Sequence, residues 1–310
     1  MDYTFYLAVL AAAVTAGTPI LYAALGELLA ERSGVLNLGV EGMMLVGAIV
    51  GFIIAVNTAN PWLGVGGAML ASGALALIHA FLTITLQANQ VVSGLALTMF
   101  GAGFSSFIGR PFVGIAAPVS FQNIPIPILS QIPYLGDIFF RHDPLVYLTY
   151  ILAPLMWFLL YWTRPGLNIQ AVGEDPAAAD AVGINVKLVR YLCVITGGMF
   201  AGLGGAYLTL AFAPLWLDGM TAGRGWIAIA LVIFAVWNPL KAIAGAYLFG
   251  GVAAMSFRMQ ILEIPVSPFF LQMMPYLFTI MVLIIVTIQA SVKRIGAPKA
   301  LGLAYDREDR

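Results

Sequence analysis

Long apolar runs, separated by short polar breaks, follow one another along almost the whole sequence. A helix that crosses the hydrocarbon core of a membrane needs about 20 predominantly apolar residues. By this measure we expect nine spans, within a range of eight to ten, near residues 4–26, 39–56, 63–85, 92–110, 145–163, 189–213, 226–238, 241–258 and 269–291. The run 226–238 is short for a full crossing, and short segments at membrane depth often line a pathway.

The polar break at residues 165–189 carries the signals of a short helix of its own. Asp175 is a favourable N-cap, and Pro176 suits the first helical position because no N–H is needed there. Residues 177–182 are long enough for about two turns, and Gly183 suits a left-handed stop. A helix with small side chains outside the bilayer fits the groove of a partner protein. A solvated loop that contains a helical turn is the alternative.

The composition agrees with a membrane protein. The chain has 310 residues, of which 61% are hydrophobic and 9% are charged, whereas soluble domains carry about 25% charged residues. A soluble protein of this composition could not cover its surface, so we expect a polytopic all-α membrane protein. The formal net charge is zero, which gives no basic field for a nucleic acid. The single cysteine, Cys193, has no internal partner for a disulfide.

The distribution of basic residues predicts an orientation. If the 165–189 break is cytoplasmic, ten lysines and arginines lie on that side, and four, Arg110, Arg141, Arg224 and Arg258, lie on the other. Cytoplasmic loops carry an excess of Lys and Arg. The sequence therefore predicts one transmembrane domain over residues 1–310, with the N-terminus outside and a short cytoplasmic tail at 292–310.

Several kinds of chemistry have no motif in this chain. There is no Gly-x-x-x-x-Gly-Lys-Ser/Thr phosphate loop, and His79 and His142 have no cysteine or carboxylate cluster beside them. We therefore expect no metal site and no catalytic residues. The acidic side chains Glu27, Glu31 and Glu41 lie at the ends of the first two spans, and the span centres are nearly free of charge. This pattern favours a pore-forming subunit driven from outside the bilayer over an enzyme or a secondary carrier.

Four stretches resemble the permease subunits of ATP-binding-cassette (ABC) importers, in the family that serves branched-chain amino acids, simple sugars and nucleosides. They run from Glu31 to Met44, Gln87 to Gly94, Ala171 to Asn185 and Gly223 to Pro239. The third stretch is specific to the permease family. The first, second and fourth stretches, together with the tail 296–305, are most similar to the shorter permease of the nucleoside-uptake branch.

This resemblance implies a fold, a location and partners. The fold would be a helical bundle like that of type II ABC importer permeases, in a bacterial or archaeal cytoplasmic (inner) membrane. A cytoplasmic ATPase would bind ATP and Mg, so this chain would hold no cofactor. A second, longer permease and an external solute-binding lipoprotein would complete the importer. The ATPase-coupling residues would be Gly173, Glu174, Asp175, Pro176, Ala177, Ala178, Ala179, Asp180, Ala181, Val182, Gly183 and Ile184.

Polar residues near the ends of spans are candidates for the solute path. They are Asn37, Glu41, Asn89, Gln90, Ser93 and Thr98. Amide and hydroxyl groups can hydrogen-bond a nucleobase or a ribose without carrying charge. The alternative is that these groups cap helix ends or satisfy freed backbone groups.

The interpretation that joins these observations is a membrane-spanning permease of an ATP-driven importer for nucleosides. An importer of the same kind for branched-chain amino acids or a simple sugar is the nearest alternative. A stand-alone secondary carrier and an integral-membrane enzyme are alternatives of other classes.

Overall fold

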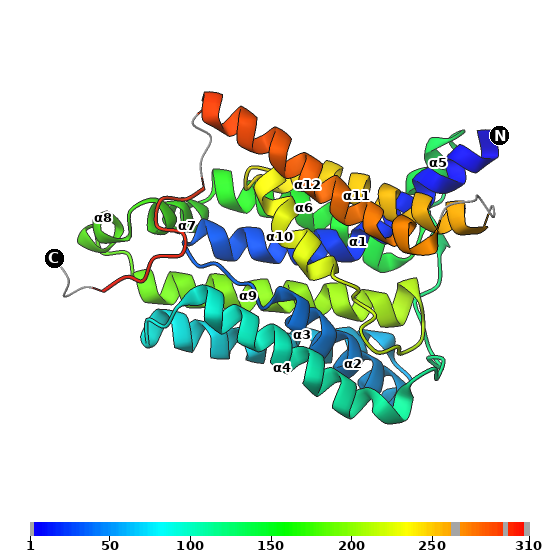
Figure 1. Cartoon of the computed structure of the whole chain (residues 1–310), viewed down its shortest axis with the longest axis horizontal. Helices are drawn as coiled ribbons and strands as arrows, with labels where there is room; N and C mark the ends of the chain where they lie inside the picture. Colours follow the sequence, from blue (N-terminus) through cyan, green and yellow to red (C-terminus); the bar gives the residue numbers. More distant parts are fainter. Residues whose placement is uncertain (1–2, 262–266, 294–296, 307–310) are drawn as a thin grey trace.

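The computed structural model describes residues 3–261, 267–293 and 297–306, and this part of the chain is almost wholly helical (Figure 1). Its α-helices are α1 (Tyr3–Arg32), α2 (Val40–Thr58), α3 (Pro61–Ala80), α4 (Gln90–Gly109), α5 (Leu135–Phe139), α6 (Pro144–Trp162), α7 (Arg164–Glu174), α8 (Pro176–Ala181), α9 (Val186–Tyr207), α10 (Arg224–Phe234), α11 (Pro239–Ile261) and α12 (Pro268–Lys293). Shorter elements are the π-turns η1 (Phe81–Thr85) and η4 (Leu208–Phe212), the 3-10 turns η2 (Arg110–Phe112) and η3 (Leu129–Gln131), and strands β1 (Ile124–Pro125) and β2 (Arg141–His142).

Each of the nine predicted spans coincides with a helix. Within the described residues, seven helical segments are long and apolar enough to cross a membrane, namely those built on α1, α2, α3, α4, α6, α9 and α11. Two predicted spans remain. Helix α10, within the predicted span 226–238, has 11 residues and is too short for a full crossing, as the sequence predicted. Helix α12, at the predicted span 269–291, has 26 residues and packs against α10 and α11.

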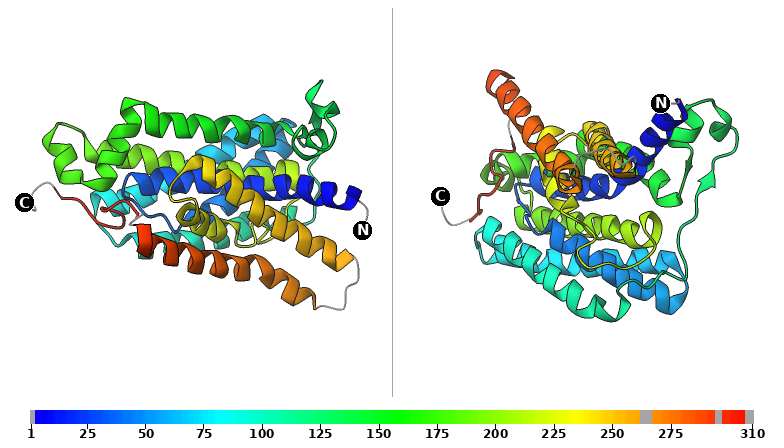
Figure 2. Two further views of the ribbon diagram at one scale, coloured as in Figure 1. Left: turned by 90° about the horizontal axis from the view of Figure 1, so that it is seen from above. Right: turned by 45° about the vertical axis from the view of Figure 1, so that its right-hand side comes forward.

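Helix α1 lies at the centre of the bundle and is covered on several sides. It packs against α9, α10 and α11, while α2 and α3 pack on α9 and on each other (Figures 1 and 2). The backbones of α1 and α9 touch at Gly26 and Gly197, where the carbonyl oxygen of each residue leaves no room for a Cβ on the other. Such close approach is how small residues stabilise helix pairs in lipid. It fixes α1 and α9 as one unit.

The helix predicted in the 165–189 break is present as α8. The Asp175 carboxylate accepts the backbone N–H of Ala178 at 2.9 Å, and Gly183 has φ +88°. Both ends therefore form as the sequence predicted. The break also contains a second helix, α7, which begins at a Thr163 N-cap and which the sequence analysis treated as loop. Figure 1 shows α7 and α8 together at one end of the bundle.

The long connection between α4 and α6 is ordered at the opposite end of the bundle. The strands β1 and β2 pair antiparallel, with Ile124 opposite His142. The side chain of Asp143 then caps α6, accepting the N–H groups of Leu145 at 2.9 Å and Val146 at 3.2 Å. The connection thus ends in a fixed entry into α6.

Candidate functional site

Helix α9 runs along the bundle and ends near the connection between α4 and α6, and the chain then returns to α10 (Figure 1). It ends in the π-turn η4, and residues 213–223 then run without helical structure until α10 begins at Arg224. Trp216 in this segment is fully buried, and the backbone N–H of Gly114 donates to its carbonyl oxygen at 2.9 Å. Figure 1 shows α10 in the middle of the bundle, away from both ends. The segment from Trp216 to Gly223 therefore leads from the end of the bundle to its middle, and non-helical backbone at membrane depth is tolerated where protein buries it or where it lines a cavity.

The start of α10 is held by one carboxylate from α2. Glu41 accepts hydrogen bonds from the hydroxyl of Thr221 at 2.6 Å and from the backbone N–H groups of Gly223 at 2.9 Å and Gly225 at 2.6 Å. A negative charge is favourable at a helix N-terminus, where backbone N–H groups have no partner within the helix. The three bonds fix α10 relative to α2.

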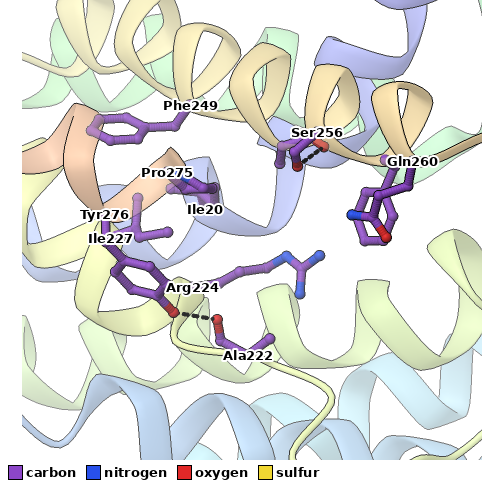
Figure 3. A pocket seen from close by; sticks show the side chains of 11 residues that line it. Ile20, Ala222, Arg224, Ile227, Phe249, Ser256, Gln260, Pro275 and Tyr276 are labelled. Carbon is purple, nitrogen blue, oxygen red and sulfur yellow. Dashed lines mark hydrogen bonds between the residues drawn. The ribbon is translucent and has the colours of Figure 1, made fainter. Parts of the chain in front are cut away.

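A cavity of about 440 Å³ opens beside this non-helical segment, between α1, α10, α11 and α12 (Figure 3). Its volume lies within the range of about 300–1,000 Å³ that small-molecule sites occupy. The wall is mostly apolar and is formed by Ile20, Ala222, Arg224, Ile227, Phe249, Ala253, Ser256, Phe257, Gln260, Pro275 and Tyr276. A mostly apolar wall with a few polar groups is typical of a binding site for a small organic solute.

The polar groups of the wall are partly used within the protein. Nη1 of Arg224 donates to the carbonyl oxygens of Met220 and Thr221, both at 3.1 Å. The Tyr276 hydroxyl donates to the carbonyl oxygen of Ala222 at 2.9 Å. Within the described residues, the Gln260 amide and the Nε and Nη2 groups of Arg224 make no hydrogen bond. These groups remain able to bind a solute, and Figure 3 shows the guanidinium extending into the cavity.

The six residues predicted for the solute path lie outside this cavity wall and have partners in the protein. The Asn37 amide oxygen accepts the N–H of Gly39 at 2.9 Å, and Asn89 caps α4 through the N–H of Val92 at 3.1 Å. Gln90 accepts the N–H of Leu36 at 2.7 Å, and Thr98 donates to the carbonyl oxygen of Leu38 at 2.8 Å. Ser93 is hydrogen-bonded to the His79 ring at 2.9 Å, and Glu41 holds the start of α10. Gln90 and Thr98 join the connection between α1 and α2 to α4, and Ser93 joins α4 to α3, whereas the bonds of Asn37 and Asn89 are local. Their role in transport stays a prediction.

The sequence analysis did not single out the residues that form the polar part of the cavity. It counted Arg224 with the external loops, whereas the structure places this residue at the start of α10, with its side chain in the cavity wall (Figure 3). It assigned no role to Ser256, Gln260 or Tyr276. The one usable signal was the shortness of segment 226–238, which marked a possible pathway and which contributes Ile227 to the wall.

A second polar cluster lies at the end of α1 nearest to α7. Glu27 accepts the backbone N–H of Asn37 at 2.9 Å, and Glu31 accepts the indole N–H of Trp237 at 2.5 Å. The guanidinium of Arg32 donates to the Trp237 carbonyl oxygen and to the hydroxyl of Tyr161. The bonds to Trp237 tie α1 to the turn between α10 and α11, and the others tie it to α6 and to its own connection with α2. Within residues 3–261, 267–293 and 297–306, no group of three His, Cys, Asp or Glu side chains is placed to hold a metal ion.

Residues 297–306, which we name the C-terminal strap, cross this end of the bundle. The N–H of Ala300 donates to the Gly173 carbonyl oxygen at 2.9 Å, and the N–H of Gly302 donates to that of Gly34 at 3.2 Å. The buried Arg190 side chain links the carbonyl oxygens of Ser33 and Leu303. The strap therefore joins α7, α9 and the connection after α1.

The comparisons with known proteins agree with this arrangement. The model of the family described as branched-chain amino acid transport system, permease component, matches residues 9–287. The protein named "Putative glucose ABC transporter permease protein TsgC13" of Haloferax volcanii is 45% identical over 98% of this chain and 99% of its own length. The guanosine ABC transporter permease protein NupQ of Bacillus subtilis is 36% identical over the full length of both chains.

A solved structure also shares the fold. The protein described as "An inward-facing conformation of a putative metal-chelate type ABC transporter" has a TM-score of 0.50 and 13% identity, with 91% of this chain and 85% of that chain covered. At this identity the likeness concerns the fold. The family match covers far more than half of the chain, and the relatives are transport subunits and not enzymes. The chain therefore belongs to the family of branched-chain amino acid transport system permease components and is a multi-pass permease subunit of an ABC importer.

Proposed function

We propose that this permease carries nucleosides. The observation that carries the proposal is the character of the cavity wall beside α10. The wall contains the aromatic rings of Phe249, Phe257 and Tyr276, one cation, Arg224, and one amide, Gln260. Aromatic rings stack on a nucleobase, and amide and guanidinium groups hydrogen-bond its polar edge.

The wall is less suited to a branched-chain amino acid. A zwitterion brings an ammonium group, which needs a carboxylate or several acceptors when it leaves water. No carboxylate lines the described cavity, and the nearby Glu41 already accepts three hydrogen bonds. A neutral solute avoids this cost.

Relatives support two neutral solutes. The guanosine permease NupQ and the nucleoside ABC transporter permease protein NupC of Lactococcus lactis, each 36% identical, support a nucleoside. The 45% identity to a protein named for glucose favours a simple sugar as the second candidate. Aromatic rings also pack against sugar rings, so the wall suits both candidates.

Helix α8 would transmit the movement of the ATPase to the permease. Its exposed face is small and apolar, with Ala177, Ala178, Ala181 and Val182 at the surface, and Val182 is 78% exposed. We assign this face, within the segment from Gly173 to Ile184, to the groove of a cytoplasmic ATPase that binds ATP and Mg. The end with α7 and α8 would then be cytoplasmic, as the basic residues predict. A second, longer permease and an external solute-binding lipoprotein would complete the importer in the inner membrane.

Uptake by cells that express the importer's genes tests this function. Labelled guanosine uptake should be competed by purine nucleosides and not by leucine. It should stop when ATP is depleted and survive when the proton gradient alone is collapsed. Competition by glucose or ribose without competition by nucleosides would assign the sugar candidate. Transport by the reconstituted chain without companions would support a stand-alone carrier instead.

A further inference from the structure

We propose that Arg224 reads the O6 and N7 edge of a 6-oxopurine, so that the permease itself selects guanosine and inosine over adenosine. This inference rests on the proposed nucleoside function and names the chemistry of the same cavity. It concerns a residue that lies in the wall of the cavity and whose guanidinium keeps free donors.

The free donors of Arg224 lie on one edge of its guanidinium. Nη1 is engaged by the carbonyl oxygens of Met220 and Thr221, each at 3.1 Å. Its Cζ atom also lies over the Phe212 ring, 5.6 Å from the ring centroid. These contacts hold the group in place, and the edge formed by Nε and Nη2 is left without a hydrogen-bond partner among the described residues. A fixed group loses little freedom when it binds.

This edge carries two parallel N–H donors and matches a pair of adjacent acceptors. Guanine and hypoxanthine present such a pair in O6 and N7, to which arginine binds with two bonds. Adenine replaces O6 with an amino donor, which opposes one of the N–H groups. In uracil an N3–H donor separates the two carbonyl oxygens, whereas cytosine has an acceptor pair on another edge, in O2 and N3. Among the purines, a 6-oxopurine is therefore the base that satisfies both donors.

The charges around the cavity also favour a neutral base over an anion. The Arg224 side chain lies near Glu41, whose carboxylate interacts with it through space. That carboxylate is held by Thr221, Gly223 and Gly225 and does not line the cavity. Glu41 thus offsets part of the positive charge of Arg224, and the free edge of the guanidinium requires acceptors. The rings of Tyr276 and Phe257 supply surfaces against which the base can stack.

The first experiment compares Arg224→Lys with the wild type in cells that express the whole importer. Lysine keeps the charge but lacks the planar pair of donors. The ratio of guanosine to adenosine uptake should fall by about 5- to 150-fold, the discrimination that one bidentate pair contributes. The wild-type and variant importers use the same solute-binding protein, so a change in the uptake ratio is caused by the permease. The matched control is Arg258→Lys in α11, a residue outside the cavity wall that stacks on Phe5. It should keep the wild-type ratio.

The second experiment leaves the chain unchanged and alters the solute. Labelled guanosine is bound to the purified complex of permeases and ATPase without the solute-binding protein, and unlabelled analogues compete. 7-Deazaguanosine, which lacks N7, should compete about 5- to 150-fold more weakly than guanosine. This test also holds if the Arg224 variant fails to fold.

The outcomes separate the two proposals. An unchanged guanosine-to-adenosine ratio in Arg224→Lys, or equal competition by 7-deazaguanosine, would overturn the role of Arg224 while nucleoside transport stands. A wild-type importer that carries glucose and no nucleoside would overturn the proposed function, and the inference with it.

Discussion

The backbone N–H of Ala300 in the C-terminal strap donates to the carbonyl oxygen of Gly173 at 2.9 Å. Gly173 lies in the last turn of α7 and has no room for a Cβ, because the carbonyl oxygen of Arg32 occupies that place. Three parts of the chain, α7, the end of α1 and the strap, therefore meet at one glycine. Helix α8 follows directly after Asp175, so this joint supports it.

Ending the chain after Lys299 should weaken this joint. The truncation removes the bonds that Ala300, Gly302 and Leu303 make with the bundle, and we expect a loss of about 2–4 kcal/mol of stability from three such bonds. Uptake should fall at equal amounts of protein in the membrane. Leu303→Ala is the control, because this side chain is 59% exposed and the variant keeps the carbonyl oxygen that Arg190 binds. Thermal unfolding and uptake measure both effects, and normal values for the truncated chain would contradict the role of the strap.

Replacing Asp175 with alanine should uncouple the permease. The change removes the acceptor for the Ala178 N–H, at a cost of about 0.5–2 kcal/mol to a helix of six residues. Asp175→Asn keeps an equivalent cap and should keep uptake. Uptake is measured in cells with verified expression. If Asp175→Ala transports as well as Asp175→Asn, α8 has no part in coupling.

Replacing Glu41 with glutamine should loosen the start of α10. An amide cannot accept from three donors as a carboxylate does, and hydrogen bonds to a charged group contribute about 1.5–3 kcal/mol each. Thr221→Val removes one of the three donors and should cost less, whereas Thr221→Ser keeps the hydroxyl and should resemble the wild type. The unfolding midpoint of the purified protein ranks the variants. Equal midpoints for Glu41→Gln and the wild type would show that the clamp is dispensable.

The carboxyl of Asp143, outside the spans, gives a pH dependence. Burial raises its pKa above the ordinary value of 3.8, although the N–H groups of Leu145 and Val146 act in the opposite direction. The folded chain then holds the proton to higher pH than the unfolded chain, so this residue's contribution to stability falls as the pH rises from 3.8 through the folded pKa.

Asp143→Asn should remove this pH dependence, because asparagine also caps a helix but carries no charge. Asp143→Ala should lower stability by about 0.5–2 kcal/mol at every pH through loss of the cap. Unfolding midpoints between about pH 4 and about pH 8 test both expectations. A wild-type curve with the same slope as that of Asp143→Asn would argue against a raised pKa.

Local signals in the sequence were sufficient for the spans and for α8. Apolar length marks a span, and Asp175, Pro176 and Gly183 act within a few residues of each other. Helix α7 was missed because Gly166 and Asn168 lower helix propensity. Contacts with α6 and α9, including the bond from the Gln170 amide to the Leu160 carbonyl oxygen at 2.6 Å, stabilise it instead. Such contacts are not visible in a local pattern.

The cavity and the strap depend on contacts between distant residues. Tyr276 donates to the carbonyl of Ala222 across 54 positions of sequence, and no local periodicity links the two. The strap is joined to Gly173 and Gly34 by backbone groups, which every residue except proline possesses. The sequence therefore shows a polar tail, and the structure is needed to see where the tail lies.

Helix α10 connects the two polar regions of the molecule. Arg224 begins it at the cavity, and its other end leads into Trp237, which is bonded to Glu31 and Arg32 beside Gly173. A helix of 11 residues is about 16 Å long and close-packed interiors transmit strain. A shift of α7 would thus reach the guanidinium through one short helix, and the affinity of the cavity for a solute would change with the position of α7.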